Sequence, residues 1–233
     1  MHTIHVNPDQ ITQVLQNNPY FHSLSQAILA EIARGTQLVR FHRGEIIFWE
    51  GEECAGLHMI EKGSVKLFKL SPHGRELVIR VLEEGATFNE VPVFDDGLNP
   101  ISVAALEDSE IWIIEAALLR HTLAHYPELA QAVIANLTEN LRTLLSMVEE
   151  LSFYQIVNRL ARLINQMPTE AETGAKVGWL TQDELAARLG TVREVVARSL
   201  RVLERSGAIR VNRRQVVVLD EARLREWAQD PWN

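Results

Sequence analysis

The feature that most constrains the fold is a series of short apolar or alternating runs between about Gln37 and Glu115, separated by glycines at an even spacing. Runs of this length and spacing are typical of strands in an antiparallel sandwich or roll. Glycine adopts positive φ without strain, which suits the tight turns between such strands. We therefore predict an antiparallel β-roll of the jelly-roll kind. The glycines are Gly44, Gly51, Gly63, Gly74, Gly85 and Gly97, and the runs are TQLVRF, EIIFWE, GLHMIEK, SVKLFKL, ELVIRVL, ISVAAL and SEIWIIE.

Helical patterns lie on both sides of these runs. Residues 8 to 34 carry apolar residues at helical spacing with a break at Pro19, and residues 115 to 127 return to a helical pattern. Pro127 opens a longer helix with an apolar stripe at heptad spacing. Such a narrow stripe pairs with a copy of itself, although it could also pack on the chain's own β domain. The predicted dimer interface comprises Ile134, Leu137, Leu141, Leu144, Val148 and Leu151.

The C-terminal third has the element order of a winged helix-turn-helix. A helix is predicted over Ser152 to Met167, followed by a polar loop. Thr181 then caps a helix with Glu184 as its capping-box partner, Gly190 ends that helix, and Thr191 caps the next. The segment AIRVNRRQVVVLD gives two strands around a polar turn. The predicted α+β chain thus has a β-roll sensor domain (1–127), a dimerisation helix (128–152) and a winged helix-turn-helix domain (153–233).

Charge is distributed unevenly between these parts. The chain has a net charge of -8, yet residues 151–233 hold 13 Lys and Arg against 10 Asp and Glu, whereas residues 1–150 hold 10 against 21. Eight arginines lie from Arg188 to Arg214, offset only by Glu194 and Glu204. A basic segment on an acidic body indicates an end that binds a polyanion.

The second helix of the predicted helix-turn-helix presents arginines on the face opposite its core residues Val196, Leu200 and Leu203. A solvated face joined by a Glu194–Arg198 ion pair is one interpretation. The motif favours DNA instead, because its second helix enters the major groove, where arginine recognises guanine and glutamate recognises cytosine. The predicted base-contacting residues are Arg193, Glu194 and Arg198. The predicted backbone-contacting residues are Thr181, Gln182, Thr191, Arg201, Arg205, Arg213 and Arg214.

Across nearly its whole length the chain resembles the Crp/Fnr family of bacterial transcription regulators. The resemblance rests on RGEIIFWEGEECAGLHMIEKGSVKLF, on GATFNEVPVF, on the long helix and on TVREVVARSLRVLE. Arg193, Glu194 and Arg198 match the Arg-Glu-x-x-x-Arg pattern of the cyclic AMP receptor branch. The resemblance implies a cyclic-nucleotide-binding-domain-like roll and a homodimer on double-stranded DNA with TGTGA-like half-sites in a near-palindrome. It also implies contact with RNA polymerase.

The sensor region departs from the cyclic AMP pattern of that family. Phe88 and Glu90 flank Asn89 at the family's glycine position, and the family's Arg-Ser pair reads Pro100-Ile101. Residues 81 to 119 contain no Lys, Arg or His, so a phosphate there meets only like charge. We therefore expect no response to cyclic nucleotides, and we expect Glu90 to cap the short helix at Val91 or to accept from backbone amides. The effector pocket that the resemblance implies comprises Phe88, Asn89, Glu90, Leu144 and Leu145.

Other cofactors and function classes receive little support from the sequence. The single cysteine, Cys54, excludes a four-cysteine iron-sulfur cluster or zinc site within one chain. Haem held by a histidine remains open, and His121 and His125 at i,i+4 lack an evident third metal ligand. The candidate haem histidines are His42, His58, His73, His121 and His125. The absence of a His-x-His pair argues against a cupin-type metalloenzyme, and no catalytic triad is evident.

The sequence contains no apolar run long enough to span a membrane and no signal peptide. We therefore expect the protein to be in the cytoplasm.

Overall fold

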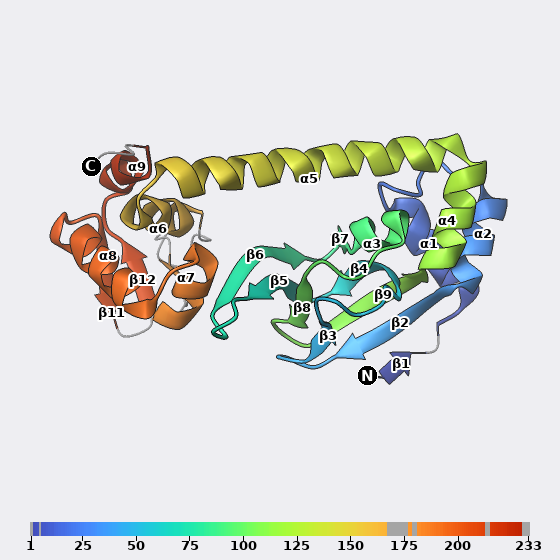
Figure 1. Cartoon of the computed structure of the whole chain (residues 1–233), viewed down its shortest axis with the longest axis horizontal. Helices are drawn as coiled ribbons and strands as arrows, with labels where there is room; N and C mark the ends of the chain where they lie inside the picture. The colour runs from blue at the N-terminus through green and yellow to red at the C-terminus, as the bar shows by residue number, and fades with distance from the viewer. Residues whose placement is uncertain (1, 5, 167–176, 179–180, 213–214, 230–233) are drawn as a thin grey trace. The chain divides into compact units, whose positions relative to one another are not determined.

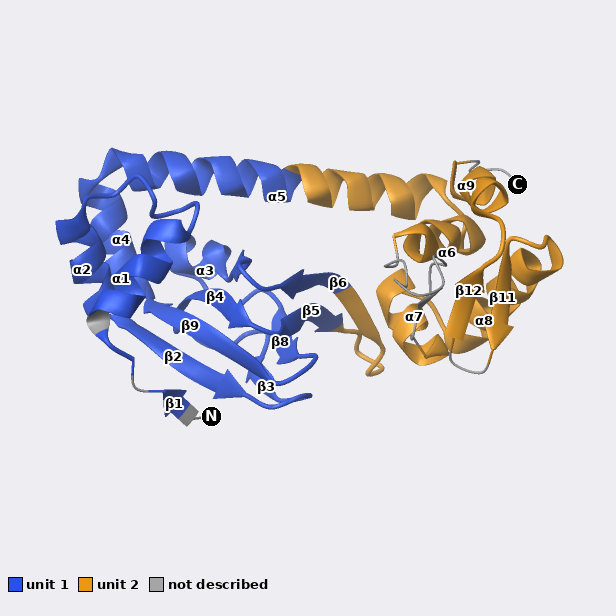
Figure 2. Cartoon of the chain, turned by 180° about the vertical axis from the view of Figure 1, so that it is seen from behind, with its two compact units in different colours: residues 1–69, 79–141 blue, residues 70–78, 142–233 orange. Residues whose placement is uncertain are grey.

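The structure, a computed structural model, describes residues 2–4, 6–166, 177–178, 181–212 and 215–229 (Figure 1). The chain forms two compact units (Figure 2). The first comprises residues 1–69 and 79–141, and the second comprises residues 70–78 and 142–233. The long helix α5 (Pro127–Phe153) contributes residues to both units, and the predicted dimerisation helix lies within it.

Two antiparallel sheets confirm the predicted roll. One sheet has the strand order β1-β2-β9-β4-β7 and the other has the order β3-β8-β5-β6. Each of the seven predicted runs contains a strand, whereas the short strands β1 and β7 were not predicted. The strands are β1 (His2–Ile4), β2 (Thr36–Phe41), β3 (Ile46–Phe48), β4 (Gly56–Lys62), β5 (Ser64–Leu70), β6 (Glu76–Glu83), β7 (Thr87–Phe88), β8 (Ser102–Ala105) and β9 (Ser109–Glu115).

The roll encloses one apolar core and packs helices over a second. Val39, Ile60, Val65, Phe88 and Ile111 belong to the first core. Because β-branched and aromatic side chains fit the faces of pleated sheets, this composition favours strands. The second core joins β4 and β9 to the helices of the unit through residues that include Leu15, Phe21, Leu29, Trp112 and Leu119. These helices are α1 (Pro8–Asn17), α2 (Gln26–Arg34), α3 (Glu90–Asp95) and α4 (Ala116–His125).

The glycine turns follow the prediction except at Gly97. Gly44, Gly51, Gly63, Gly74 and Gly85 all have positive φ. At the remaining turn the left-handed conformation falls one residue earlier, on Asp96, with φ 61°. The carboxylate of Asp95 accepts the Gly97 N–H at 2.8 Å and closes this turn, so the prediction for Gly97 was wrong.

His58 is a buried titratable group within the roll. Its ring stacks on Phe88 with centroids 4.9 Å apart and also contacts Phe48, while its Nδ1 donates to the Gly56 carbonyl at 2.9 Å. Burial lowers the pKa of His58 from 6.5 to about 4, against the opposing effect of the Gly56 carbonyl. The imidazole is therefore neutral at pH 7.

This shift predicts a loss of stability in acid. Because the folded-state pKa lies below the unfolded-state value, the stabilising effect is complete above about pH 6.5 and decreases as the pH falls toward 4. At pH 5 the expected loss is about 2 kcal/mol of unfolding free energy. Urea unfolding at pH 7 and pH 5 measures it, with His58→Phe as the non-titrating variant. An equal loss in the wild type and in the variant contradicts this assignment.

The second unit contains a winged helix-turn-helix, as predicted. The predicted helix from Ser152 is interrupted, because α5 continues to Phe153 and the next helix begins at Ile156. The strands form a sheet with the order β10-β12-β11. The short strand β10 and the C-terminal helix α9 were not predicted. The elements are α6 (Ile156–Asn165), β10 (Val177–Gly178), α7 (Gln182–Leu189), α8 (Arg193–Arg205), β11 (Ile209–Asn212), β12 (Gln215–Val218) and α9 (Glu221–Gln229).

An amphipathic pattern explains why these elements pack together. One core joins α6, α7, α8 and β11, and it contains the almost completely buried residues Leu160, Leu185, Val196, Leu203 and Ile209.

Among the helices described, none is long and apolar enough to cross a membrane.

Candidate nucleic-acid interface and effector site

The first helix of the helix-turn-helix begins and ends with specific capping interactions. Thr181 Oγ1 accepts the Glu184 N–H at 3.2 Å and Glu184 Oε2 accepts the Thr181 N–H at 2.6 Å, which confirms the predicted capping box. At the other end Gly190 has φ 65°, and the Thr191 N–H donates to the Ala186 carbonyl at 3.0 Å. This is a Schellman closure, which needs glycine or a residue that tolerates positive φ.

The recognition helix begins one residue later than predicted. Val192 is the N-cap of α8 and provides no side-chain cap, so the prediction that Thr191 caps this helix was wrong. The Schellman closure uses the backbone of Thr191 to end α7, and the chain becomes helical only after Val192. Thr191 and Gln182, both predicted to contact the DNA backbone, therefore lie at the turn and at the first position of α7.

Helix α8 presents its charged residues to solvent and its apolar residues to the core. Arg193, Glu194 and Arg198 are exposed, whereas Val196 and Leu200 are buried. In the described part of the chain, neither Glu194 nor Arg198 forms an ion pair, so the ion pair of the solvated-helix interpretation is not formed. Both side chains are thus available to an external partner.

Arg193, the first of the exposed arginines, contacts two residues at the start of α7. Arg193 Nε donates to Gln182 Oε1 at 3.4 Å, and Arg193 Nη1 lies 3.8 Å from an oxygen of Asp183. Arg193 and Asp183 are well exposed, with 63% and 72% of their side chains accessible, so the contact is weak and leaves the guanidinium accessible. The two helices therefore place Arg193 at the start of the exposed face.

Two of the predicted backbone-contacting arginines lie along the rest of α8. Arg201 and Arg205 are exposed, and Arg201 Nε donates to the Ala197 carbonyl at 3.1 Å. Glu204 accepts the Val211 N–H at 2.9 Å and so joins α8 to the first strand of the wing. Arg213 and Arg214 lie outside the described residues.

Sequence reasoning missed a buried arginine that supports the turn. Arg159 of α6 is 9% exposed, and its Nη2 donates to the Leu189 carbonyl at 2.9 Å. Burial lowers the pKa of Arg159, and the Glu150 carboxylate opposes this shift. A cation at the C-terminus of α7 matches the negative end of the helix dipole and fixes the turn that precedes α8. The arginine on a strongly amphipathic helix was visible in the sequence, but its distant carbonyl partner was not.

In the first unit, the predicted effector residues Phe88 and Asn89 are held inside the roll. Phe88 is 1% exposed and stacks on His58. Asn89 has φ 75°, which explains asparagine at a glycine position, because asparagine tolerates the left-handed region better than most residues. Its Nδ2 donates to Asn99 Oδ1 at 3.0 Å and to the Gly56 carbonyl at 3.3 Å.

Glu90 is satisfied within the protein, in a way that the sequence did not predict. It is the first residue of α3 and 7% exposed, and its Oε1 accepts from the hydroxyls of Tyr20 and Thr87, each at 3.1 Å. The expected roles as a cap of the helix at Val91 or as an acceptor of backbone amides are therefore wrong. Burial, and next the charge of Glu90, raise the pKa of Tyr20 well above its usual range, so Tyr20 remains a donor.

The contacts at the family's nucleotide position involve side chains of this protein. Glu90 Oε1 accepts from both Tyr20 and Thr87, and the side chains of Pro100 and Ile101 carry no hydrogen-bond donor. The other two predicted effector residues, Leu144 and Leu145, lie on α5 in the second unit and are 49% and 61% exposed.

The predicted dimer stripe on α5 has no partner within the described chain over most of its length. Ile134, Leu141, Leu144, Val148 and Leu151 are each 48% exposed or more. Leu137 is half-buried and packs against the core of the first unit. Large apolar side chains exposed in a row along one helix indicate an interaction surface.

The described histidines lie in separate surroundings. His58 lies against the rings of Phe48 and Phe88, and His42 Nδ1 lies 3.6 Å from Asp108 Oδ1. The rings of His121 and His125 are tilted by 37°, with centroids 4.3 Å apart. Among the described residues, no group of three or more His, Cys, Asp or Glu could hold a metal ion.

The chain matches known proteins over both of its units. Residues 38–126 match the family model of the cyclic nucleotide-binding domain, and residues 158–227 match that of the Crp-like helix-turn-helix domain. A solved structure of a transcriptional regulator of the CRP/FNR family from Thermus thermophilus is similar, with a TM-score of 0.70 and 26% identity over 83% of this chain and 99% of that chain.

Two curated relatives match almost end to end. The chain is 29% identical over 217 residues to the "Cyclic AMP receptor protein" of Thermus thermophilus, covering 92% of this chain and 98% of that protein. It is 27% identical over 217 residues to the "CRP-like cAMP-activated global transcriptional regulator" of Mycobacterium tuberculosis, covering 91% and 97%. Because both domain models occur in the order that the roll and the winged helix-turn-helix show, the chain belongs to the Crp/Fnr family of transcriptional regulators.

Proposed function

We propose that the protein is a homodimer that reads a near-palindromic DNA site with TGTGA-like half-sites, under the control of an effector other than a cyclic nucleotide. The observation that carries the proposal is the exposed face of α8. Arg193, Glu194 and Arg198 are accessible there, while the opposite face forms the core of the domain. In a helix-turn-helix this face lies in the major groove, where arginine donates to guanine and glutamate accepts from cytosine.

Dimerisation is proposed through the exposed stripe of α5. Two copies related by a twofold axis would bury it and place two α8 helices for the two half-sites of a palindrome. The predicted backbone contacts of Arg201 and Arg205 add affinity and salt dependence. Contact with RNA polymerase remains an expectation from the family.

The proposed effector differs from that of the cyclic AMP-activated relatives. Two observations support this proposal. Glu90 accepts hydrogen bonds from Tyr20 and Thr87, and residues 81 to 119 contain no Lys, Arg or His that could bind a phosphate. An effector that prefers one of two placements of the DNA-binding domains would shift the population between them.

The test is a fluorescence anisotropy titration onto a palindrome with TGTGA half-sites, with and without cyclic AMP. We expect specific binding with the same Kd in both cases, and at least about 1,000-fold weaker binding to an unrelated duplex. Equal affinity for both duplexes contradicts the proposed site. A tenfold or greater gain with cyclic AMP contradicts the proposed effector class but leaves the DNA site standing. An absorption spectrum of the purified protein tests haem, and a Soret band would replace the proposed effector class with a gas or redox signal.

A further inference from the structure

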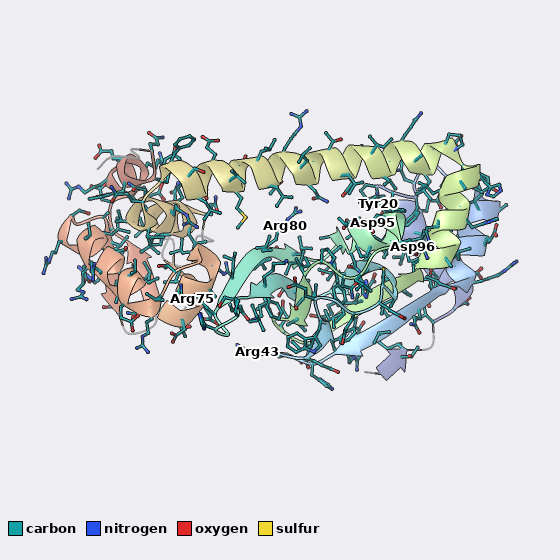
Figure 3. The ribbon with its side chains drawn as sticks, viewed as in Figure 1. Tyr20, Arg43, Arg75, Arg80, Asp95 and Asp96 are labelled. Carbon is teal, nitrogen blue, oxygen red and sulfur yellow. The ribbon has the colours of Figure 1, made fainter. Side chains whose placement is uncertain are left out.

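Arg80 of the roll forms no ion pair among the described residues and reaches the long helix. Arg80 lies on β6 (Figure 3). Its Nη1 donates to Asn140 Oδ1 of α5 at 2.8 Å. Asn140 Nδ2 in turn donates to Asn136 Oδ1, one helical turn earlier, at 2.9 Å. All three residues belong to the first unit. A guanidinium from the roll and two amides from α5 therefore meet at one place.

The direction of Arg80 is unusual for a charged residue on a strand. Alternate residues of a strand point to the same face, so Arg80 shares its face with Leu82 and Val78, which are 5% and 8% exposed. Leu82 belongs to the core of the roll, yet Arg80 is exposed. The inner face of β6 is thus accessible to solvent at Arg80. An inward-pointing charge can also protect an edge strand from pairing with another chain, and β6 is at the end of its sheet.

Arg80 forms a single side-chain hydrogen bond within the described residues, which leaves most of its donors unused. A guanidinium has N–H groups on all its nitrogens in a rigid fork. Within the described residues, Arg80 bonds only to Asn140 and forms no ion pair, whereas Arg40 and Arg120 of the same unit pair with Glu110 and Asp96. The free edge of the fork matches the oxygens of a carboxylate or phosphate, and the amides of Asn136 and Asn140 add short polar groups beside it.

We propose that Arg80, with Asn136 and Asn140, is the anion-binding site of the effector, and that the effector is a small metabolite with a carboxylate or phosphate group. The proposal rests on the proposed function, in which the roll senses an effector. It places the cation on β6, just before the segment 81–119 that has no Lys, Arg or His, and not at Pro100 where the family's arginine would be. An anion held from both sides would tie β6 to α5, the helix that leads to the DNA-binding unit. Its binding would therefore favour conformations in which these elements are close.

The experiment uses the full-length protein and two probes, inorganic phosphate and succinate, at constant ionic strength. Calorimetry gives the affinity, and arginine side-chain NMR follows the Nε–H signal of Arg80, assigned by its loss in Arg80→Gln. We expect at least one probe to shift this signal saturably. Because hydrogen bonds to a charged group are lost, Arg80→Gln should weaken binding about tenfold or more. Asn140→Ala should weaken binding several-fold. Arg43→Gln removes the same charge from another exposed arginine of the unit and should bind like the wild type.

The outcomes separate the possibilities. Binding of phosphate alone identifies a phosphorylated effector, and binding of succinate alone identifies a carboxylate. The proposal is overturned if neither probe shifts the Arg80 signal, as edge protection by Arg80 predicts, or if Arg80→Gln and Arg43→Gln weaken binding equally. Saturation of the Arg80 signal by cyclic AMP would keep the anion site and contradict the proposed effector class. Failure of the wild type to bind the palindrome would contradict the proposed DNA site without affecting this result.

Discussion

Val148→Glu should convert the protein to a monomer and abolish tight binding to the palindrome. Val148 lies on the exposed stripe of α5, with 58% of its surface accessible, so glutamate is tolerated in the isolated chain. In the proposed dimer two glutamates would be buried opposite each other without partners, a cost of about 3–5 kcal/mol. Dimer affinity should fall on the order of 100-fold or more. DNA affinity should fall at least as far, because each monomer then binds one half-site without the gain from linkage to the other.

Sedimentation velocity over a range of concentrations measures the monomer–dimer equilibrium, and anisotropy measures DNA binding. Ser146→Glu is the matched control, since it adds the same charge to an exposed position of the same helix away from the stripe. A dimer of unchanged affinity in Val148→Glu would mean that α5 does not form the interface. If both variants dissociate equally, the effect is one of net charge and not of the stripe.

Arg198→Ala should lower the affinity for the specific site and remove much of its sequence preference. A bidentate contact between arginine and guanine is worth about 1–3 kcal/mol, and a symmetric dimer loses it twice, about 2–6 kcal/mol in total. Because Arg198 is exposed and forms no ion pair in the described structure, its removal should leave the fold intact. Anisotropy titrations with the wild-type palindrome and with single-base variants measure the change.

Arg201→Ala provides the comparison one turn along the same helix. As a proposed phosphate contact, Arg201 should contribute equally to every sequence, so its variant should bind all duplexes more weakly and lose about one unit of salt dependence per half-site. If Arg198→Ala keeps the full preference for the wild-type bases and behaves like Arg201→Ala, the proposed base contact is wrong.

Local signals in the sequence predicted most of the architecture. The glycine-punctuated runs, the heptad stripe and the capping box of Thr181 and Glu184 depend on residues within a few positions of each other, and all appear in the structure. The misplaced details also had local causes. Asp96 and not Gly97 adopted the left-handed conformation, and Thr191 closed α7 instead of opening α8.

The interior of the candidate sites was harder to predict. Tyr20 and Glu90 are 70 positions apart in the sequence, and Arg159 and Leu189 are 30 positions apart. No periodic pattern in the sequence relates partners at such separations. The missed helix α9 is held in part by Asn158, whose amide donates to the Trp227 carbonyl at 3.0 Å. Arg80 lies one position before the segment 81 to 119, and only the fold shows that its side chain reaches α5.

The hydrogen bond between Tyr20 and Glu90 shows that the packed unit extends beyond the residues that match the family model. The cyclic nucleotide-binding family model covers residues 38–126, yet Tyr20 lies outside that span. So do Leu15, Phe21 and Leu29, which are completely buried against it. A fragment cut at the limits of the family model would expose this apolar surface and leave Glu90 without one of its two donors. The N-terminal helices are therefore part of the core of the first unit, and changes in them reach the buried carboxylate of Glu90 directly.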